Sequence, residues 1–223
     1  MRFDAIIFDC DGVLVDSEVL GNQVLAEVMS EHGVPMTAAD SIRAFMGRSM
    51  GGIIEKATEL AGRDMRAVCE SIFMPRLSEA FGARLKAIEG IDGLLSGLSA
   101  PRAVASSSPT TRLHRSLEVT GLLRHFGGHV YSVDLVQRPK PAPDVFLLAA
   151  ERLGIGPASC VVVEDSVGGV TAAVAAGMRC VGFTAGRHCG DGHGERLLAA
   201  GAERIACSAR ELERLFATTT LSR

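Results

Sequence analysis

The stretch Phe3–Glu18 reads FDAIIFDCDGVLVDSE, an apolar run that ends abruptly at two carboxylates. Such a run predicts a buried strand of a parallel sheet. Because side chains on an extended backbone alternate between faces, we expect Asp9 and Asp11 to point to the same side at the carboxyl end of this strand. Two ionised carboxylates in one small site repel each other, so either one carries a proton or a cation lies between them. An ordinary acidic turn after a strand is the alternative.

The composition limits the class of protein. The chain has 223 residues, of which 47% are hydrophobic, and a formal net charge of −3. This length suits one large core or a core with a small second domain. The slight acidity and the lack of a Lys/Arg block argue against a nucleic-acid surface, so a small anionic partner would need a local positive site.

Two further features of the composition concern the location of the protein. Because the sequence contains neither an apolar stretch of about 20 residues nor a signal-like leader, we expect no membrane association and a cytoplasmic protein. The six cysteines lack paired spacing. We therefore expect reduced, mostly buried thiols.

The pattern after the first strand predicts two domains. Helical periodicity indicates a four-helix domain formed by residues 17–86. From Gly90 onward strands and helices alternate, which predicts an α/β core of residues 1–16 and 87–223, built on a doubly wound parallel sheet with its site at the carboxyl ends of the strands. The four helices are expected at Glu18–His32, after a capping box at Thr37–Asp40, at Ser49–Leu60, and at Asp64–Phe81, where Pro75 would kink or split the helix.

Three other segments would reach the same edge of the sheet. The serines 106–108 form a strand-to-helix turn that could hold a phosphate, although an ordinary helix cap explains them about as well. Lys140 lies between prolines in RPKPAPD, residues 138–144, which would hold its ammonium group rigidly where a helix begins. Glu164 and Asp165 repeat the arrangement of an apolar strand followed by acids. Asp165, Asp9 and a backbone carbonyl would make the all-oxygen ligand set that Mg²⁺ takes.

These segments, in this order, resemble the four motifs of the haloacid dehalogenase superfamily. The resemblance is to its beta-phosphoglucomutase-like branch, and most of all to its sugar-phosphate (6-phosphogluconate-type) phosphatases. The matching segments are DCDGVLVDSE at 9–18, the serines at 106–108, KPAPD at 140–144 and ED at 164–165. The resemblance covers essentially the whole chain. It implies that residues 17–86 are a cap that closes over the active site of a haloacid dehalogenase-like core.

The resemblance also implies a role for each matched residue in the reaction. Asp9 would attack phosphorus and become an aspartyl phosphate, while Asp11 would protonate the leaving alkoxide and later activate water. Lys140 and Ser106 would bind the transferring oxygens. Other expected contacts to substrate or phosphate come from Ser107, Ser108, Glu18 and Arg48.

The implied cofactor is Mg²⁺. Asp9 and Asp165 would bind the ion together with the main-chain carbonyl of Asp11. Glu164 would not bind the ion itself but would hold a water molecule that is bound to it. A magnesium ion in this position would keep Asp9 ionised and spread the charge of the transition state.

The leading functional hypothesis is a Mg²⁺-dependent phosphatase for a small sugar or sugar-acid phosphate, acting as a monomer or weak homodimer. The alternative is a beta-phosphoglucomutase, but mutases of this branch carry a histidine early on the first cap helix, and Val19–Asn22 contains none. A haloacid dehalogenase would lack the aspartate at the position of Asp11. A binding module without activity is disfavoured because the acidic and basic motif residues are intact.

Two glycine-rich segments carry weaker signals. His188, Cys189 and His193 resemble metal ligands, but they lie in residues 186–194 without a fourth ligand, so we expect a plain loop. Gly168 and Gly169 lack the three-glycine spacing of a dinucleotide site, and we expect them to allow close helix packing.

Overall fold

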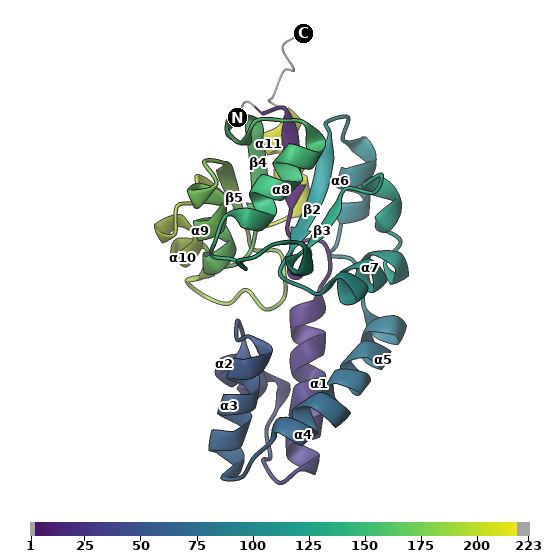
Figure 1. Cartoon of the computed structure of the whole chain (residues 1–223), viewed down its shortest axis with the longest axis vertical. Coiled ribbons are helices and arrows are strands. Elements are labelled where there is room, and N and C mark those ends of the chain that lie inside the picture. The colour runs from purple at the N-terminus through teal and green to yellow at the C-terminus, as the bar shows by residue number, and fades with distance from the viewer. Residues whose placement is uncertain (1–2, 218–223) are drawn as a thin grey trace. The chain divides into compact units, whose positions relative to one another are not determined.

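The computed structural model describes residues 3–217 and divides the chain into two compact units (Figure 1). The larger unit contains the chain up to Asp16 and again from Lys86 onward, and the smaller unit is Ser17–Leu85. Within the larger unit, the two connections are paired with each other, because Asp16 N donates to Lys86 O at 3.0 Å and Val15 forms an antiparallel bridge with Ala87. Lys86 therefore belongs with the larger unit, although the sequence pattern placed it in the smaller one.

A six-stranded parallel sheet, ordered β3-β2-β1-β4-β5-β6, forms the centre of the larger unit. The strands are nearly all buried, as expected when helices cover both faces of a parallel sheet. The predicted doubly wound α/β fold is therefore confirmed. The strands are β1 Ala5–Phe8, β2 Arg102–Ser106, β3 Val130–Ser132, β4 Cys160–Glu164, β5 Arg179–Phe183 and β6 Arg204–Ala206.

The register of the three central strands places the site. The strand order reverses at β1, because the chain proceeds to β2 on one side and later to β4 on the other. Such a reversal leaves a crevice beyond the carboxyl ends of the strands. Phe8 is in register with Val104 of β2 and with Val163 of β4. The next residue of each strand segment, Asp9, Ala105 and Glu164, therefore lies at the same level of the sheet.

Helices cover both faces of this sheet. On one face α8 lies over β1, β2 and β3 while α9 lies over β4 and β5 (Figure 1), and Ile7, Phe146 and Val162 belong to the apolar core beneath them. Phe8 points to the opposite face, where its ring packs edge-on against Phe126. The helices of this unit are α6 Ile91–Gly97, α7 Thr110–Val119, α8 Asp144–Leu153, α9 Val167–Ala175, α10 His193–Ala199 and α11 Ala209–Ala217.

The smaller unit is helical, as expected. Its capping box is present, because Thr37 Oγ1 accepts from Asp40 N at 3.1 Å and Asp40 Oδ2 accepts from Thr37 N at 2.8 Å. The fourth predicted helix is not continuous: a π-helical turn, Cys69–Phe73, separates two α-helical segments. Pro75 cannot donate a main-chain hydrogen bond, and the chain changes register just before it, where Met74 N donates to Cys69 O. The α-helices are α1 Ser17–Glu31, α2 Ala38–Phe45, α3 Met50–Ala61, α4 Arg66–Val68 and α5 Met74–Arg84.

Several details of the larger unit differ from the sequence pattern. The expected loop 186–194 runs into a helix, since α10 begins at His193, and α11 was not predicted. All six cysteines are free thiols, and four are buried, while Cys189 is half-buried and Cys207 exposed. Among residues 3–217, no helix combines the length and the apolar character needed to cross a membrane.

Candidate active site

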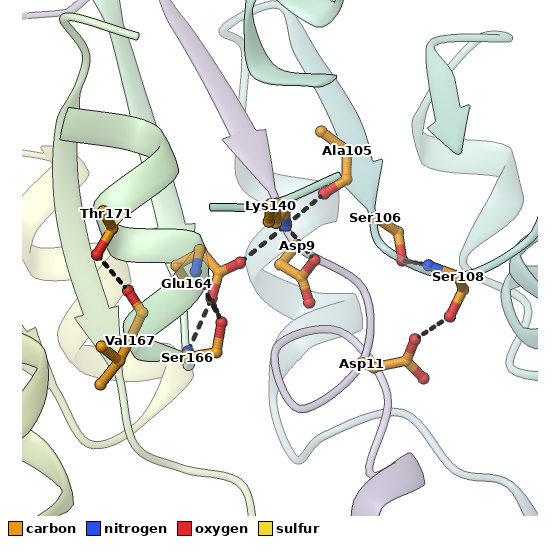
Figure 2. Close-up of polar contacts among 11 residues, drawn as sticks. Asp9, Asp11, Ala105, Ser106, Ser108, Lys140, Glu164, Ser166, Val167 and Thr171 are labelled. Atoms are coloured by element: carbon orange, nitrogen blue, oxygen red, sulfur yellow. Dashed lines mark hydrogen bonds and ion pairs between the residues drawn. The ribbon is translucent and has the colours of Figure 1, made fainter. Parts of the chain in front are cut away.

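Lys140 occupies the centre of the candidate site, at the level where β1, β2 and β4 end (Figure 2). Its Nζ donates to Asp9 Oδ1 at 2.6 Å, to Glu164 Oε1 at 2.8 Å and to Ala105 O at 3.0 Å. The side chain is 5% exposed, and the ammonium lies 4.5 Å from the centre of the Phe146 ring. The proline-rich segment before α8 thus places one cation at the carboxyl ends of β1, β2 and β4.

The charges in this cluster are unbalanced. Burial alone would lower the pKa of Lys140, but the Asp9 and Glu164 carboxylates raise it above its ordinary value, so the lysine is charged. Burial raises the pKa of Asp9 well above its ordinary range; Lys140 lowers it, whereas Glu164 and Asp165 raise it. One buried ammonium therefore contacts two acidic groups, while Asp165 adds a third acid that acts on Asp9.

Glu164 is the most completely held acid of the cluster. It is 1% exposed, and its Oε2 accepts from Ser166 N at 2.8 Å and from Ser166 Oγ at 2.9 Å, opposite the Lys140 contact (Figure 2). Ser166 also caps α9 by accepting from Gly169 N at 3.0 Å. This helix approaches the acid so closely that a Cβ on Gly169 would lie 1.7 Å from Glu164 Oε1.

Asp11 has partners other than those of Asp9. Its carboxylate accepts from Ser108 Oγ at 2.5 Å and from Arg112 Nη2 at 2.9 Å, and Figure 2 shows it turned toward Ser108. β1 ends at Phe8 and Gly12 turns the chain with φ of 81°, so strand alternation does not extend to Asp11. The expectation that the two acids share one proton or one cation stays a prediction.

The three serines after β2 differ in burial and in the groups they contact. Ser106 is buried, and its Oγ accepts from Ser108 N at 3.0 Å, which shapes the turn before α7. Ser108 is also buried and reaches Asp11, while Ser107 is exposed. Arg112 was not identified from the sequence, although it lies in the first turn of α7, four residues after Ser108.

The chain is similar in sequence to proteins of a known family. A family model described as a haloacid dehalogenase-like hydrolase matches residues 6–183. The chain belongs to this family. It is 31% identical to the 6-phosphogluconate phosphatase of Escherichia coli strain K12 over 188 residues, which cover 84% of this chain and 85% of that protein. The resemblance to the beta-phosphoglucomutase-like branch is thereby confirmed.

Two solved structures are similar over nearly the whole chain. A conserved haloacid dehalogenase-like protein of unknown function from Agrobacterium tumefaciens strain C58 has a TM-score of 0.88 at 38% identity, covering 97% of this chain and 98% of the other. A hydrolase of the family from Deinococcus radiodurans R1, crystallised with phosphate and sodium, has a TM-score of 0.84 at 34% identity, covering 97% and 96%. The protein is a haloacid dehalogenase-like phosphatase.

The acids of this haloacid dehalogenase-like phosphatase fit a magnesium ion. Asp9 and Asp165 offer nearly buried carboxylates from the ends of adjacent strands, and Asp165 helps to raise the pKa of Asp9, an effect that a bound cation would offset. Hard oxygen donors of this kind suit Mg²⁺. The residues that would hold it are Asp9, Asp165 and the main-chain carbonyl of Asp11.

Asp165 has partners that sequence reasoning missed. His188 Nε2 lies 2.8 Å from Asp165 Oδ2, and His193 Nε2 lies 2.6 Å from Asp165 O. Residues 186–192 form the expected loop and His193 begins α10, but His188 is buried and both histidines contact a motif residue. No local signal revealed this, since the partners come from β4 and from the segment after β5.

Two candidate residues belong to the smaller unit. Arg48 Nε donates to Ala44 O at 2.9 Å, and Glu18 O accepts from Asn22 Nδ2 at 2.8 Å within α1. Their expected contacts with substrate stay predictions.

Proposed function

We propose that this phosphatase is Mg²⁺-dependent and hydrolyses a small phosphorylated metabolite, a sugar or sugar-acid phosphate, through an aspartyl phosphate on Asp9. The observation that carries the proposal is the Lys140 ammonium held 2.6 Å from Asp9 and 2.8 Å from Glu164 at the ends of β1 and β4. The likeness to a 6-phosphogluconate phosphatase supports the substrate class. Residues 17–85 would act as the cap that selects the substrate.

The first half-reaction transfers the phosphoryl group to the protein. An Asp9 oxygen attacks phosphorus in line with the ester oxygen, so that a bond to Asp9 forms as the ester P–O bond breaks. Asp11 gives a proton to the departing alkoxide. Lys140 reduces the repulsion between the carboxylate and the phosphate dianion, and Ser106 offers its hydroxyl to a transferring oxygen.

The second half-reaction restores Asp9. Asp11 takes a proton from water as the water oxygen attacks phosphorus, and the bond to Asp9 breaks to release inorganic phosphate. Ser108 and Arg112, which contact Asp11, are positioning residues for this proton transfer. When bound, Mg²⁺ supplies a Lewis acid that neutralises phosphate charge.

Substitution of Asp9 tests the nucleophile. Asp9→Asn keeps the volume but removes the nucleophile, so we expect no phosphate release and an unchanged far-ultraviolet circular dichroism spectrum. Asp4→Asn is the matched control, because Asp4 is exposed just before β1, at its amino end. Phosphate release by Asp9→Asn at more than a trace of the wild-type rate would refute the covalent mechanism.

EDTA should abolish wild-type turnover and Mg²⁺ should restore it.

The identity of the substrate is tested with a panel of phosphorylated metabolites that includes 6-phosphogluconate. A phosphatase releases inorganic phosphate in step with substrate loss. Beta-glucose 1-phosphate with a trace of glucose 1,6-bisphosphate separates this activity from a mutase, which would accumulate glucose 6-phosphate with little free phosphate. Dominance of glucose 6-phosphate in that mixture would replace the proposal by the mutase.

A further inference from the structure

Three side chains that bind transition metals gather beside the proposed magnesium site. His188, Cys189 and His193 each offer one ligand atom, and these atoms all lie within 4.8 Å of one another. In a tetrahedral Zn²⁺ site with bonds of about 2.0–2.3 Å, ligand atoms are about 3.4–3.6 Å apart, so the group must close by about 1 Å. Gly190 and Gly192 lie within this segment and allow an adjustment of that size.

The group is directed toward a fourth potential ligand. His188 Nε2 lies 3.3 Å from Cys189 Sγ and also 2.8 Å from Asp165 Oδ2. His193 Nε2 is 2.6 Å from the main-chain oxygen of the same aspartate. An ion bound at His188 Nε2 would therefore have a sulfur atom and a carboxylate oxygen within reach. Asp165, directly after β4, thus offers the fourth ligand that residues 186–194 lack.

Packing holds the histidines in this arrangement. The His188 side chain is 3% exposed, and its ring meets the His193 ring edge-on, with centroids 5.7 Å apart and an interplanar angle of 89°. A Cβ on Gly186 would lie 2.5 Å from His188 Cε1, and one on Gly12 would lie 2.9 Å from the same atom. Two glycines thus allow the ring to lie against the main chain of the first motif, which an unstructured loop would not need.

We propose that His188, Cys189 and His193 form a second metal site, for a transition metal ion such as Zn²⁺, with the Asp165 carboxylate as the fourth ligand. On binding, the ion replaces the thiol proton of Cys189, which passes to solvent. Imidazole and thiolate favour Zn²⁺ over Mg²⁺, whereas the donors around Asp9 are oxygen atoms. The two sites therefore select different ions.

The shared aspartate gives the second site a consequence for activity, and this step rests on the proposed function. Asp165 would be both a magnesium ligand and the fourth ligand of the new site. A carboxylate that has turned to Zn²⁺ is lost to Mg²⁺, so occupation of the second site inhibits the phosphatase. The inhibition is relieved by excess Mg²⁺ because the two ions compete for one side chain.

Binding is tested with Co²⁺ as a spectroscopic probe of the full-length protein after treatment with EDTA. We expect wild type to bind Co²⁺ with a sulfur-to-cobalt charge-transfer band in the near ultraviolet, and Zn²⁺ to displace it. Cys189→Ser should lose the band, and His193→Gln should weaken binding about tenfold or more. Cys207→Ser is the matched control, because this thiol is exposed and beside Thr184. No band in wild type, or an equal band in Cys189→Ser, would overturn the site.

Coupling is tested by Zn²⁺ inhibition of phosphate release at several Mg²⁺ concentrations. Cys189→Ser and His193→Gln should each require about tenfold or more Zn²⁺ for the same inhibition, while Cys207→Ser should match wild type. Equal inhibition of all four proteins would show that Zn²⁺ acts only by replacing Mg²⁺, and would overturn the coupling. Failure of the proposed function is distinguishable, because phosphate release would then be absent without Zn²⁺ while the cobalt band persisted.

Discussion

At the scale of single residues, the buried acids of the candidate active site depend on one cation, Lys140. Lys140 Nζ contacts the buried carboxylates of Asp9 and Glu164, and its side chain is 5% exposed. Removing one partner of such a contact leaves the other charges buried without compensation, which costs more than the contact itself contributes. The lysine therefore stabilises the larger unit, and its role in phosphate binding is part of the proposed function.

Replacing Lys140 by methionine keeps the length of the side chain but removes its charge. We expect Lys140→Met to lower the free energy of unfolding by about 3–5 kcal/mol and to reduce phosphate release by about 100-fold or more. Urea unfolding and initial rates measure the two effects. Lys86→Met, at an exposed lysine, is the control. A Lys140→Met protein as stable as that control would contradict the role assigned to the buried contacts.

At the scale of elements, α9 must begin very close to β4. A Cβ on Gly169 would lie 1.7 Å from Glu164 Oε1 and 1.9 Å from its Cδ, whereas one on Gly168 would meet nothing within 4 Å. Gly169→Ala therefore forces Glu164 away from Lys140 and Ser166, and we expect a loss of about 1–3 kcal/mol with weaker activation by Mg²⁺. Thermal unfolding and a Mg²⁺ titration measure these effects.

The neighbouring glycine provides the control for that substitution. Gly168→Ala adds the same methyl group to the same helix without a clash, and alanine in a helix is favoured over glycine by about 0.5–1 kcal/mol. We expect this variant to be slightly more stable than wild type and fully active. Equal stability of the two variants would show that the close approach of α9 to Glu164 does not matter.

The capping box of α2 makes the stability of the smaller unit depend on pH. Hydrogen bonds from the Thr37 side chain and main chain lower the pKa of Asp40, and the Arg43 charge lowers it further. Because the pKa of the folded state lies below that of the unfolded state, the stabilisation is present above the unfolded value of about 3.9 and is lost as pH falls through the folded value.

Asp40→Asn tests this dependence. We expect the variant to melt at a lower temperature than wild type at pH 7, and the difference to shrink as pH falls below about 4 and through the lowered pKa of folded Asp40. Salt should reduce the difference, because Asp40 is partly exposed. A difference in melting temperature that is the same at pH 7 and pH 3 would contradict the argument.

At the scale of the whole molecule, the two units are joined by connections that are paired within the larger one. Asp16 N donates to Lys86 O at 3.0 Å, and Ile88 N donates to Leu14 O at 2.9 Å. A short linker of glycine and serine could therefore join Asp16 to Lys86 in place of Ser17–Leu85 without stretching the core. The sheet and its helices keep their own apolar core in such a protein.

We expect this shortened protein to fold and to hydrolyse p-nitrophenyl phosphate slowly, because Asp9, Asp11, Lys140 and Asp165 remain. Its preference among sugar phosphates should be lost, since the proposed substrate contacts of the smaller unit are removed. Circular dichroism and the ratio of kcat/KM for a sugar phosphate to that for p-nitrophenyl phosphate measure the outcome. The same ratio as in the full-length protein would show that residues 17–85 do not select the substrate.

Features that depend on local pattern were predictable from the amino-acid sequence. The alternation of strands and helices after Gly90 and the capping box at Thr37–Asp40 were both predicted, because apolar periodicity and capping signals act within a few residues. The acidic ends of β1 and β4 could be identified for the same reason. The π-helical turn before Pro75 could not, because several ways of accommodating a proline in a helix fit the same pattern.

The sequence alone thus established the order of strands and helices, the motifs and the family they resemble. The partners of the reactive groups depend on tertiary structure: Lys140 meets Asp9 across 131 positions, and Arg112 meets Asp11 across 101. Likewise, the contacts of His188 with Asp165 exist only because β4 and β5 are adjacent. Sequence periodicity reports which face of an element is buried, whereas hydrogen bonds form between atoms that strand register and loop packing bring within about 3 Å.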